Sequence, residues 1–140
     1  IRALYMESVE LLKTKKFDKA SKILNRALQI DPNYFLALVA RGGANIGLGK
    51  FTYAINDYEK ALQLNPQSAS PLFGLGEAYR GLGDPGKAKV YYSRYLTSDQ
   101  AKETPELSDS ARRFLAALEK SGADDAAAGI IKNQSPNSQK

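Results

Sequence analysis

The chain has 140 residues, which is enough for one domain with a hydrophobic core, and it carries a formal net charge of +5. It contains neither cysteine nor histidine, which excludes disulfides, Cys/His metal sites, thiol nucleophiles and histidine acid–base chemistry. No signal peptide is visible and no run approaches the ~18 apolar residues of a membrane helix. We therefore expect a soluble domain, with cytoplasm, periplasm and a secreted form all left open.

The first 34 residues are predicted to form two helices, over 1–12 and 17–30, joined by a turn at 14–16. That turn lacks a glycine, so we expect it to be less sharply specified than the later turns. This segment holds most of the excess positive charge, with 7 basic and 4 acidic residues. Its basic side chains are Lys13, Lys15, Lys16, Lys19, Lys22 and Arg26. We interpret them as a solvated outer helix face; a patch for nucleic acid or another anionic surface is the alternative.

Residues 35–66 are predicted to form a second helix pair with a turn at Gly49, a position that favours positive φ. In its second helix, apolar residues recur at i, i+3, i+4, i+7, i+10 and i+11, the spacing of one helix face. They are Phe51, Ala54, Ile55, Tyr58, Ala61 and Leu62. Gly42 lets the paired backbones approach closely, and Asn65-Pro66 ends the pair. Neither helix can bury its apolar face alone.

A third pair is expected over 71–82 and 85–97, with Asp84 as N-cap and Pro85 in the first helical turn. Its end departs from the pattern. Tyr95 stands where the earlier pairs have Ala27 and Ala61, and a bulky residue at a close-packing position predicts that the regular array ends here.

The segment after the third pair is predicted to be a single amphipathic helix over 105–120, ended by Gly122. Its apolar face carries Leu107, Ala111, Phe114, Leu115 and Leu118. Residues 122–140 have the polar composition of a disordered tail. Our hypothesis for this tail is a short helix over 124–131 whose Ile130 and Ile131 dock on a neighbouring surface, such as another molecule.

The helix pairs recur with a period of 34 residues, which is typical of a helical solenoid. Leu75, Gly76 and Tyr79, followed by Ala88 and Tyr92, form L-G-x-x-Y and A-x-x-x-Y arrangements that resemble the tetratricopeptide repeat (TPR) family. The resemblance implies an all-α, right-handed superhelical α-solenoid. Its parts would be repeats at 1–34, 35–68 and 69–102, a capping helix at 103–121 and a polar tail at 122–140. Because the chain starts on the first position of a repeat, we expect a domain excised from a longer protein.

In TPR proteins the first helix of each repeat lines a concave groove, and the resemblance implies a peptide-binding face at the matching positions here. These positions are Tyr5, Met6, Val9, Leu36, Val39, Ala40, Gly43, Ile46, Gly47, Phe73, Gly74, Glu77 and Arg80. We interpret the small residues as room for a peptide backbone or helix, flanked by aromatic and aliphatic side chains. Glu77 and Arg80 would add polar contacts at one end. The alternative is that the glycines serve packing only, or that neighbouring helices fill the groove.

Many TPR co-chaperones clamp the C-terminal carboxylate of a chaperone tail with Lys, Asn and Arg side chains. The matching positions here are Tyr5, Val9, Ala40, Ser70 and Gly74, none of which can clamp a carboxylate. The resemblance therefore implies an apolar or amphipathic peptide or helix as ligand rather than a chaperone tail.

Nothing in the sequence predicts catalysis or a cofactor. Phosphate-loop, G-x-S-x-G and H-E-x-x-H motifs are absent, and the glycine cluster at 42–49 lies inside a helical pattern with no preceding strand. Asp57 and Glu59 are two residues apart on a helix, so they face different directions and make no acid–base pair.

Three function classes remain open. The first is a scaffold or adaptor that binds a peptide or helix of another protein. The second is a self-assembly module that associates through its C-terminal tail. The third is a regulatory domain of a larger protein, such as a bacterial envelope or secretion factor.

Overall fold

The computed structural model describes the backbone of residues 1–133 and the side chains of residues 1–121. The described backbone is helical with short connections and contains no strand. The helices are α1 (Arg2–Lys13), α2 (Phe17–Ile30), α3 (Phe35–Gly47), α4 (Phe51–Leu64), α5 (Ser70–Leu82), α6 (Pro85–Leu96), α7 (Gln100–Glu103) and α8 (Pro105–Asn133). The all-α class is confirmed.

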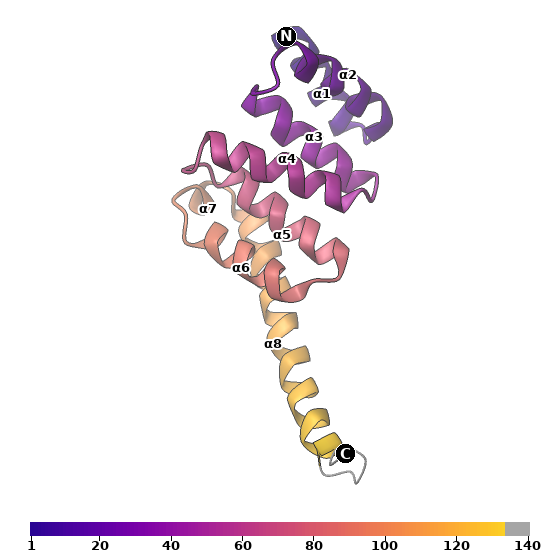
Figure 1. Cartoon of the computed structure of the whole chain (residues 1–140). Helices are drawn as coiled ribbons and strands as arrows, with labels where there is room; N and C mark the ends of the chain where they lie inside the picture. The colour runs from indigo at the N-terminus through magenta and orange to yellow at the C-terminus, as the bar shows by residue number, and fades with distance from the viewer. Residues whose placement is uncertain (134–140) are drawn as a thin grey trace.

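Helices α1 to α6 form three hairpins that stack in sequence order, so the prediction of a solenoid is also confirmed (Figure 1). Each second helix packs on the first helix of the next hairpin, and the first helices α1, α3 and α5 also pack on one another. Because the second helices lie farther apart than the first helices, the stack curves toward α1, α3 and α5. We call the side lined by these three helices the inner face.

The three hairpin turns have the same geometry, including the first one, for which we expected a less defined turn. Gly49 and Gly83 have φ of 73° and 79°, and Lys15 adopts the same left-handed conformation with φ of 59°. In each turn a backbone N–H donates to the carbonyl five residues earlier, as from Lys16 to Leu11 at 2.8 Å and from Lys50 to Asn45 at 2.8 Å. The expectation was wrong because packing of the hairpin imposes the turn on a lysine despite its steric cost.

Glycines of the first helices make room for aromatic rings of the second helices. A Cβ at Gly42 would lie 2.6 Å from Cζ of Tyr58, and a Cβ at Gly74 would lie 2.3 Å from the same atom, so the Tyr58 ring is held between α3 and α5. A Cβ at Gly47 would lie 2.5 Å from the ring of Phe17. Room for a bound peptide is therefore the wrong explanation for Gly47 and Gly74, whose missing side chains accommodate the protein's own rings.

One polar cluster ties α2, α3 and α4 together on the side away from the inner face. Arg41 donates to both carboxylate oxygens of Asp57, at 3.0 Å from Nε and 2.7 Å from Nη2. Asn45 donates to Asp57 at 3.1 Å, and Arg41 also donates to the Asn25 side chain at 3.1 Å. Asp57 is buried whereas Glu59 is exposed, so the expected divergence of these two carboxylates is confirmed.

The regular array changes where Tyr95 replaces alanine. Tyr95, Ala27 and Ala61 are all buried, so the larger tyrosine needs more space at this position of the repeat. Its ring packs edge-on against Phe73 of α5, with ring centroids 5.2 Å apart. The Tyr95 phenol occupies the space next to α5 where the first helix of a fourth repeat would otherwise pack. The short helix α7 intervenes there, and α8 packs mainly on α6 and α7.

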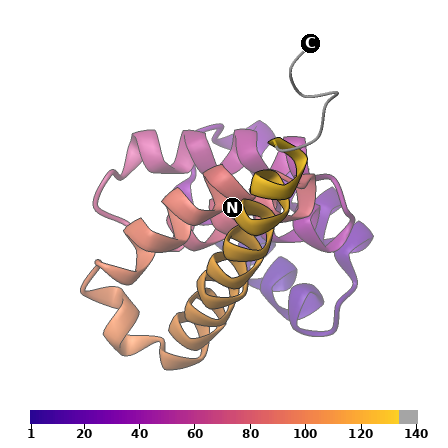
Figure 2. The same cartoon turned by 90° about the horizontal axis from the view of Figure 1, so that it is seen from below.

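Helix α8 does not end at Gly122, where the sequence predicted its end, but runs on to Asn133 and projects away from the stack (Figures 1 and 2). A single glycine costs only about 0.8–1.0 kcal/mol in a helix, and the alanine-rich residues that follow favour the helix. The helix expected at 124–131 is thus part of α8. The docking hypothesis for Ile130 and Ile131 concerns side chains outside the described set.

Candidate functional site

A cavity of about 440 Å³ opens on the inner face at the end of the array. It lies between α5, α7 and the first turn of α8, and the ends of two tyrosines from α4 and α6 complete its wall. Its lining residues are Tyr58, Ala69, Ser70, Phe73, Gly74, Glu77, Tyr95, Gln100, Glu103, Thr104 and Leu107. The volume falls within the range of about 300–1,000 Å³ that is usual for ligand sites.

Hydrogen bonds fix α7 as one wall of this cavity. The Gln100 side chain accepts from the backbone N–H of Ala69 at 2.7 Å, which ties α7 to the residue before α5. Thr104 donates to the Gln100 carbonyl at 2.9 Å, and its hydroxyl is also bonded to the Tyr95 phenol. Ser108 of α8 donates to the Ala101 carbonyl at 2.5 Å. Hydrogen bonds to the start of α5, to α6 and to α8 therefore hold α7 in place as a wall of the cavity.

Glu77 is the charged group of α5 at this site, and its side chain is half-buried. Burial raises the pKa of the Glu77 carboxyl above its ordinary value, and the nearby Arg80 guanidinium only partly opposes the shift. Burial also raises the pKa of the Tyr58 phenol, with the charges of Glu77 and Asp57 adding to the effect. The Tyr92 hydroxyl, from α6, is buried without a hydrogen-bond partner among the described residues.

The cavity brings together only part of the predicted groove: Phe73, Gly74 and Glu77 line it. Arg80 lies outside it, with its guanidinium 5.0 Å from the centre of the Phe114 ring of α8. Ile46 packs into the apolar core beside Ala54 and Leu75.

The remaining predicted residues lie on α1 and α3, away from this cavity. Tyr5 packs edge-on against Tyr34 at 6.1 Å, and Val39 and Ala40 pack against the core around Leu24 and Leu38. Met6 and Leu36 are 47% and 43% exposed. A Cβ at Gly43 would meet only the Tyr58 hydroxyl, at 3.8 Å, so this glycine has no packing partner that requires it.

Sequence reasoning missed most of the cavity wall. The sequence marks Tyr95 as an exception to the repeat but not as a lining residue. Gln100 and Glu103 belong to a short helix that the sequence analysis does not predict, and Thr104 follows directly after it. Tyr58 was assigned to the apolar face of its helix. Its position opposite two glycines, Gly42 and Gly74, was the signal that its ring crosses to the inner face.

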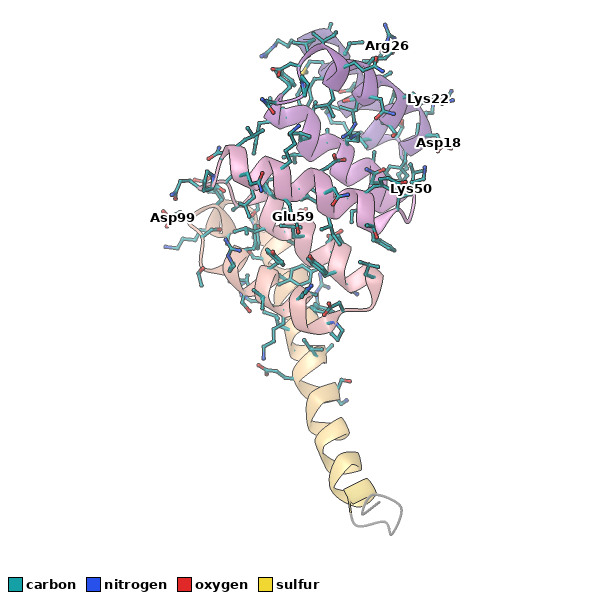
Figure 3. All side chains as sticks on the ribbon, viewed as in Figure 1. Asp18, Lys22, Arg26, Lys50, Glu59 and Asp99 are labelled. Carbon is teal, nitrogen blue, oxygen red and sulfur yellow. The ribbon has the colours of Figure 1, made fainter. Side chains whose placement is uncertain are left out.

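The basic residues of the first repeat lie elsewhere. Lys22 and Arg26 lie along the outer edge of the molecule on α2, with Asp18 on the same edge and Lys50 in the neighbouring turn (Figure 3). All four side chains are exposed. They belong to a mixed-charge surface well away from the cavity.

The described residues contain neither a metal-ligand cluster nor a membrane-spanning helix. No group of three or more His, Cys, Asp or Glu side chains in that part of the chain is arranged to hold a metal ion. None of the described helices is both long and apolar enough to cross a membrane.

Comparison with known sequences gives matches over most of the helical array. The family described as tetratricopeptide repeat matches residues 1–34 and 69–102, and the family described as TPR repeat matches residues 46–83. The Hsp70-Hsp90 organizing protein of Triticum aestivum is 28% identical over 88 residues, which is 63% of this chain and 15% of that protein. The outer dynein arm-docking complex subunit 4 of Xenopus laevis is 33% identical over 88 residues, 63% of this chain and 17% of that protein. The chain thus spans less than a fifth of these relatives.

Solved structures share most of the architecture. The type III secretion chaperone SycD of Yersinia enterocolitica, in complex with a peptide of the translocator YopD, superposes with a TM-score of 0.78 at 17% identity, over 86% of this chain and 93% of that one. The first TPR of Spaghetti (RPAP3), bound to the HSP90 peptide SRMEEVD, gives a TM-score of 0.72 at 25% identity, over 84% and 91%. With the 34-residue period, the stacked hairpins and the sequence matches, the chain belongs to the tetratricopeptide repeat family.

Proposed function

We propose that this domain is a protein-interaction adaptor that binds an apolar or amphipathic peptide segment of another protein on its inner face. The observation that carries the proposal is the preformed cavity between α5, α7 and α8, whose walls include Phe73, Tyr95 and Leu107. Apolar side chains such as Met6 and Leu36 are exposed on the first helices of the other two repeats. An apolar surface of this kind on a soluble domain is typical of a binding site.

The same residues argue against a C-terminal carboxylate as the main recognition element. At the clamp positions the structure has Tyr5, Val9 and Ala40, which carry neither a cation nor an amide, while Ser70 and Gly74 lie in the wall of a cavity whose charged residues are acidic. One structural neighbour is bound to an HSP90 peptide and another to a peptide of a translocator. Both support a protein partner for this chain, and its own side chains favour contacts along the partner's apolar residues.

The test is peptide selection followed by direct measurement. Peptides selected from a random 16-residue display library on the intact 140-residue chain would be synthesised with a fluorophore, and their Kd values measured by anisotropy. Gly43→Leu and Ser70→Trp place bulk on the inner face and should each weaken binding by about tenfold or more, or ~1.4 kcal/mol. Val90→Glu, on the exposed outer surface of α6, is the matched control and should leave Kd unchanged. Selected peptides that bind all variants equally, or a failure to select any peptide, would contradict the proposal.

Self-association is the second candidate, favoured by one feature: α8 extends well beyond the body of the solenoid (Figure 1). If it serves assembly, the mass measured by light scattering should rise with concentration, and deletion of residues 122–140 should abolish the rise. A monomer at all concentrations would exclude this candidate. The third candidate is a regulatory domain of a larger protein, which is compatible with the chain spanning less than a fifth of these relatives.

A further inference from the structure

The cavity on the inner face combines apolar walls with charge of one sign. Its charged lining residues are Glu77 of α5 and Glu103 of α7, and no lysine or arginine is among its lining residues. The chain as a whole carries a net charge of +5. The acidic character of the cavity therefore opposes the overall charge of the protein, and it is a local feature.

Glu77 has a less complete set of partners than the other carboxylate held inside the array. Asp57 accepts two hydrogen bonds from one guanidinium and a third from Asn45. Among the described residues Glu77 accepts no comparable hydrogen bond; the nearby Arg80 lowers its pKa somewhat, but the Arg80 guanidinium lies over the ring of Phe114. A carboxylate in a partly desolvated position is unfavourable without a paired cation, so Glu77 is suited to receive one from a ligand.

We propose that this cavity takes the side chain of a lysine or arginine of the bound peptide. The aliphatic stem would lie against Phe73 and Leu107 while the cation reaches the carboxylates of Glu77 and Glu103. Long basic side chains bury their methylene groups against apolar surface in this way and keep the charged end at a polar partner. The inference rests on the proposed peptide binding and adds a specificity to it: an apolar or amphipathic segment with one basic anchor.

Because hydrogen bonds hold α7 in place, the proposed site for the basic side chain is preorganised. Gln100 is fixed to Ala69 and Thr104 to Tyr95, so Glu103 is carried on an element that is already in place before a peptide arrives. Binding a peptide then requires little further ordering of α7, so little conformational entropy is lost. A hydrogen bond between two charged groups is also stronger than one between neutral groups. A neutral side chain of similar length should fill the cavity but leave the carboxylates without a cation.

The experiment uses the peptides selected on the intact chain whose binding is lost in Gly43→Leu or Ser70→Trp. They should share an enriched lysine or arginine at one position, although a protein of net charge +5 disfavours basic peptides in general. Replacing that arginine by citrulline, or that lysine by norleucine, should raise Kd for the wild-type chain by about tenfold. In the Glu77→Gln/Glu103→Gln variant the same replacement should change Kd by less than about threefold, because the cation no longer has its partners.

Glu106→Gln is the matched control. Glu106 is an exposed carboxylate in the first turn of α8 and does not line the cavity. Its loss removes one negative charge, half of the change in the double variant, and should leave the preference for the basic residue intact. Inner-face peptides without an enriched basic position would overturn this inference and leave peptide binding standing. A basic residue whose contribution is the same in wild type and in the double variant would also overturn it. If no inner-face peptide is selected, the proposed function itself fails.

Discussion

Two adjacent glycines of α3 should respond differently to the same substitution. Gly43→Ala should stabilise the chain by about 0.8–1.0 kcal/mol, because alanine favours the helix and the new Cβ meets only the Tyr58 hydroxyl, at 3.8 Å. Gly42→Ala gains the same helix propensity but places its Cβ 2.6–2.9 Å from three atoms of the Tyr58 ring. The ring cannot withdraw, since it already fills the space beside Gly74 on the other side.

Overpacking of this kind costs about 1–3 kcal/mol, so Gly42→Ala should range from neutral to about 2 kcal/mol destabilising. The two variants should differ by about 1–3 kcal/mol, the overpacking cost alone. Urea unfolding followed by far-UV circular dichroism measures both, with unchanged m-values showing that the unfolding transition is the same.

The first repeat offers a natural control for this reasoning. At the positions 34 residues earlier, the buried pair is Ser8 and Leu24, so a side chain larger than glycine is accommodated when the ring is absent. In a Tyr58→Leu background, Gly42→Ala should therefore become favourable by up to about 1 kcal/mol. If Gly42→Ala is as stabilising as Gly43→Ala in the wild-type chain, the Tyr58 ring does not hold the helices in the way described here.

Three further changes test other parts of the structure. Lys15→Gly should raise the free energy of unfolding by about 1 kcal/mol, because glycine removes the steric cost of φ at 59°; an unchanged urea midpoint would argue against the left-handed turn. Asp57→Ala should cost about 3 kcal/mol, since Arg41 and the buried Asn45 lose their acceptor, and Arg41→Ala/Asp57→Ala should cost less than the sum of the single changes in the same assay. Glu77→Gln should raise Tm at pH 7. Because the pKa of Glu77 is raised in the folded protein, the wild type loses stability as pH rises above about 4.5, where this carboxyl ionises in the unfolded chain. The glutamine variant does not lose this stability, so the Tm difference between the two proteins should vanish below that pH. An equal difference at pH 4 and pH 7 would show that the ionised carboxylate is not the cause.

The repeat architecture could be predicted from sequence because its signals are local and recur. Apolar spacing gave the helices, and Gly49, Asn65-Pro66 and Asp84 marked their ends close to where the structure places them. The turn at Lys15 was harder to predict because the left-handed residue is a lysine. Its geometry comes from the packing of the hairpin and not from local preference.

The cavity could not be predicted because it depends on side chains from distant positions. Tyr95 signalled the end of the regular array, but its contacts with Phe73 and Thr104 follow from how α7 folds back on the start of α5. Gly47 illustrates the opposite error. Its place in the repeat suggested room for a ligand, whereas the space is taken by Phe17, a residue 30 positions earlier in the chain.

The most direct measurement of peptide binding on the inner face is a titration of the ¹⁵N-labelled chain with a selected peptide, followed by amide chemical shifts. The largest shifts should be at Gly74, Glu77 and Leu107, around the cavity between α5 and α8. Tyr53 and Val90, exposed on the second helices α4 and α6, should stay near their free positions. Shifts confined to the second helices, with the cavity residues unaffected, would contradict binding at the inner face.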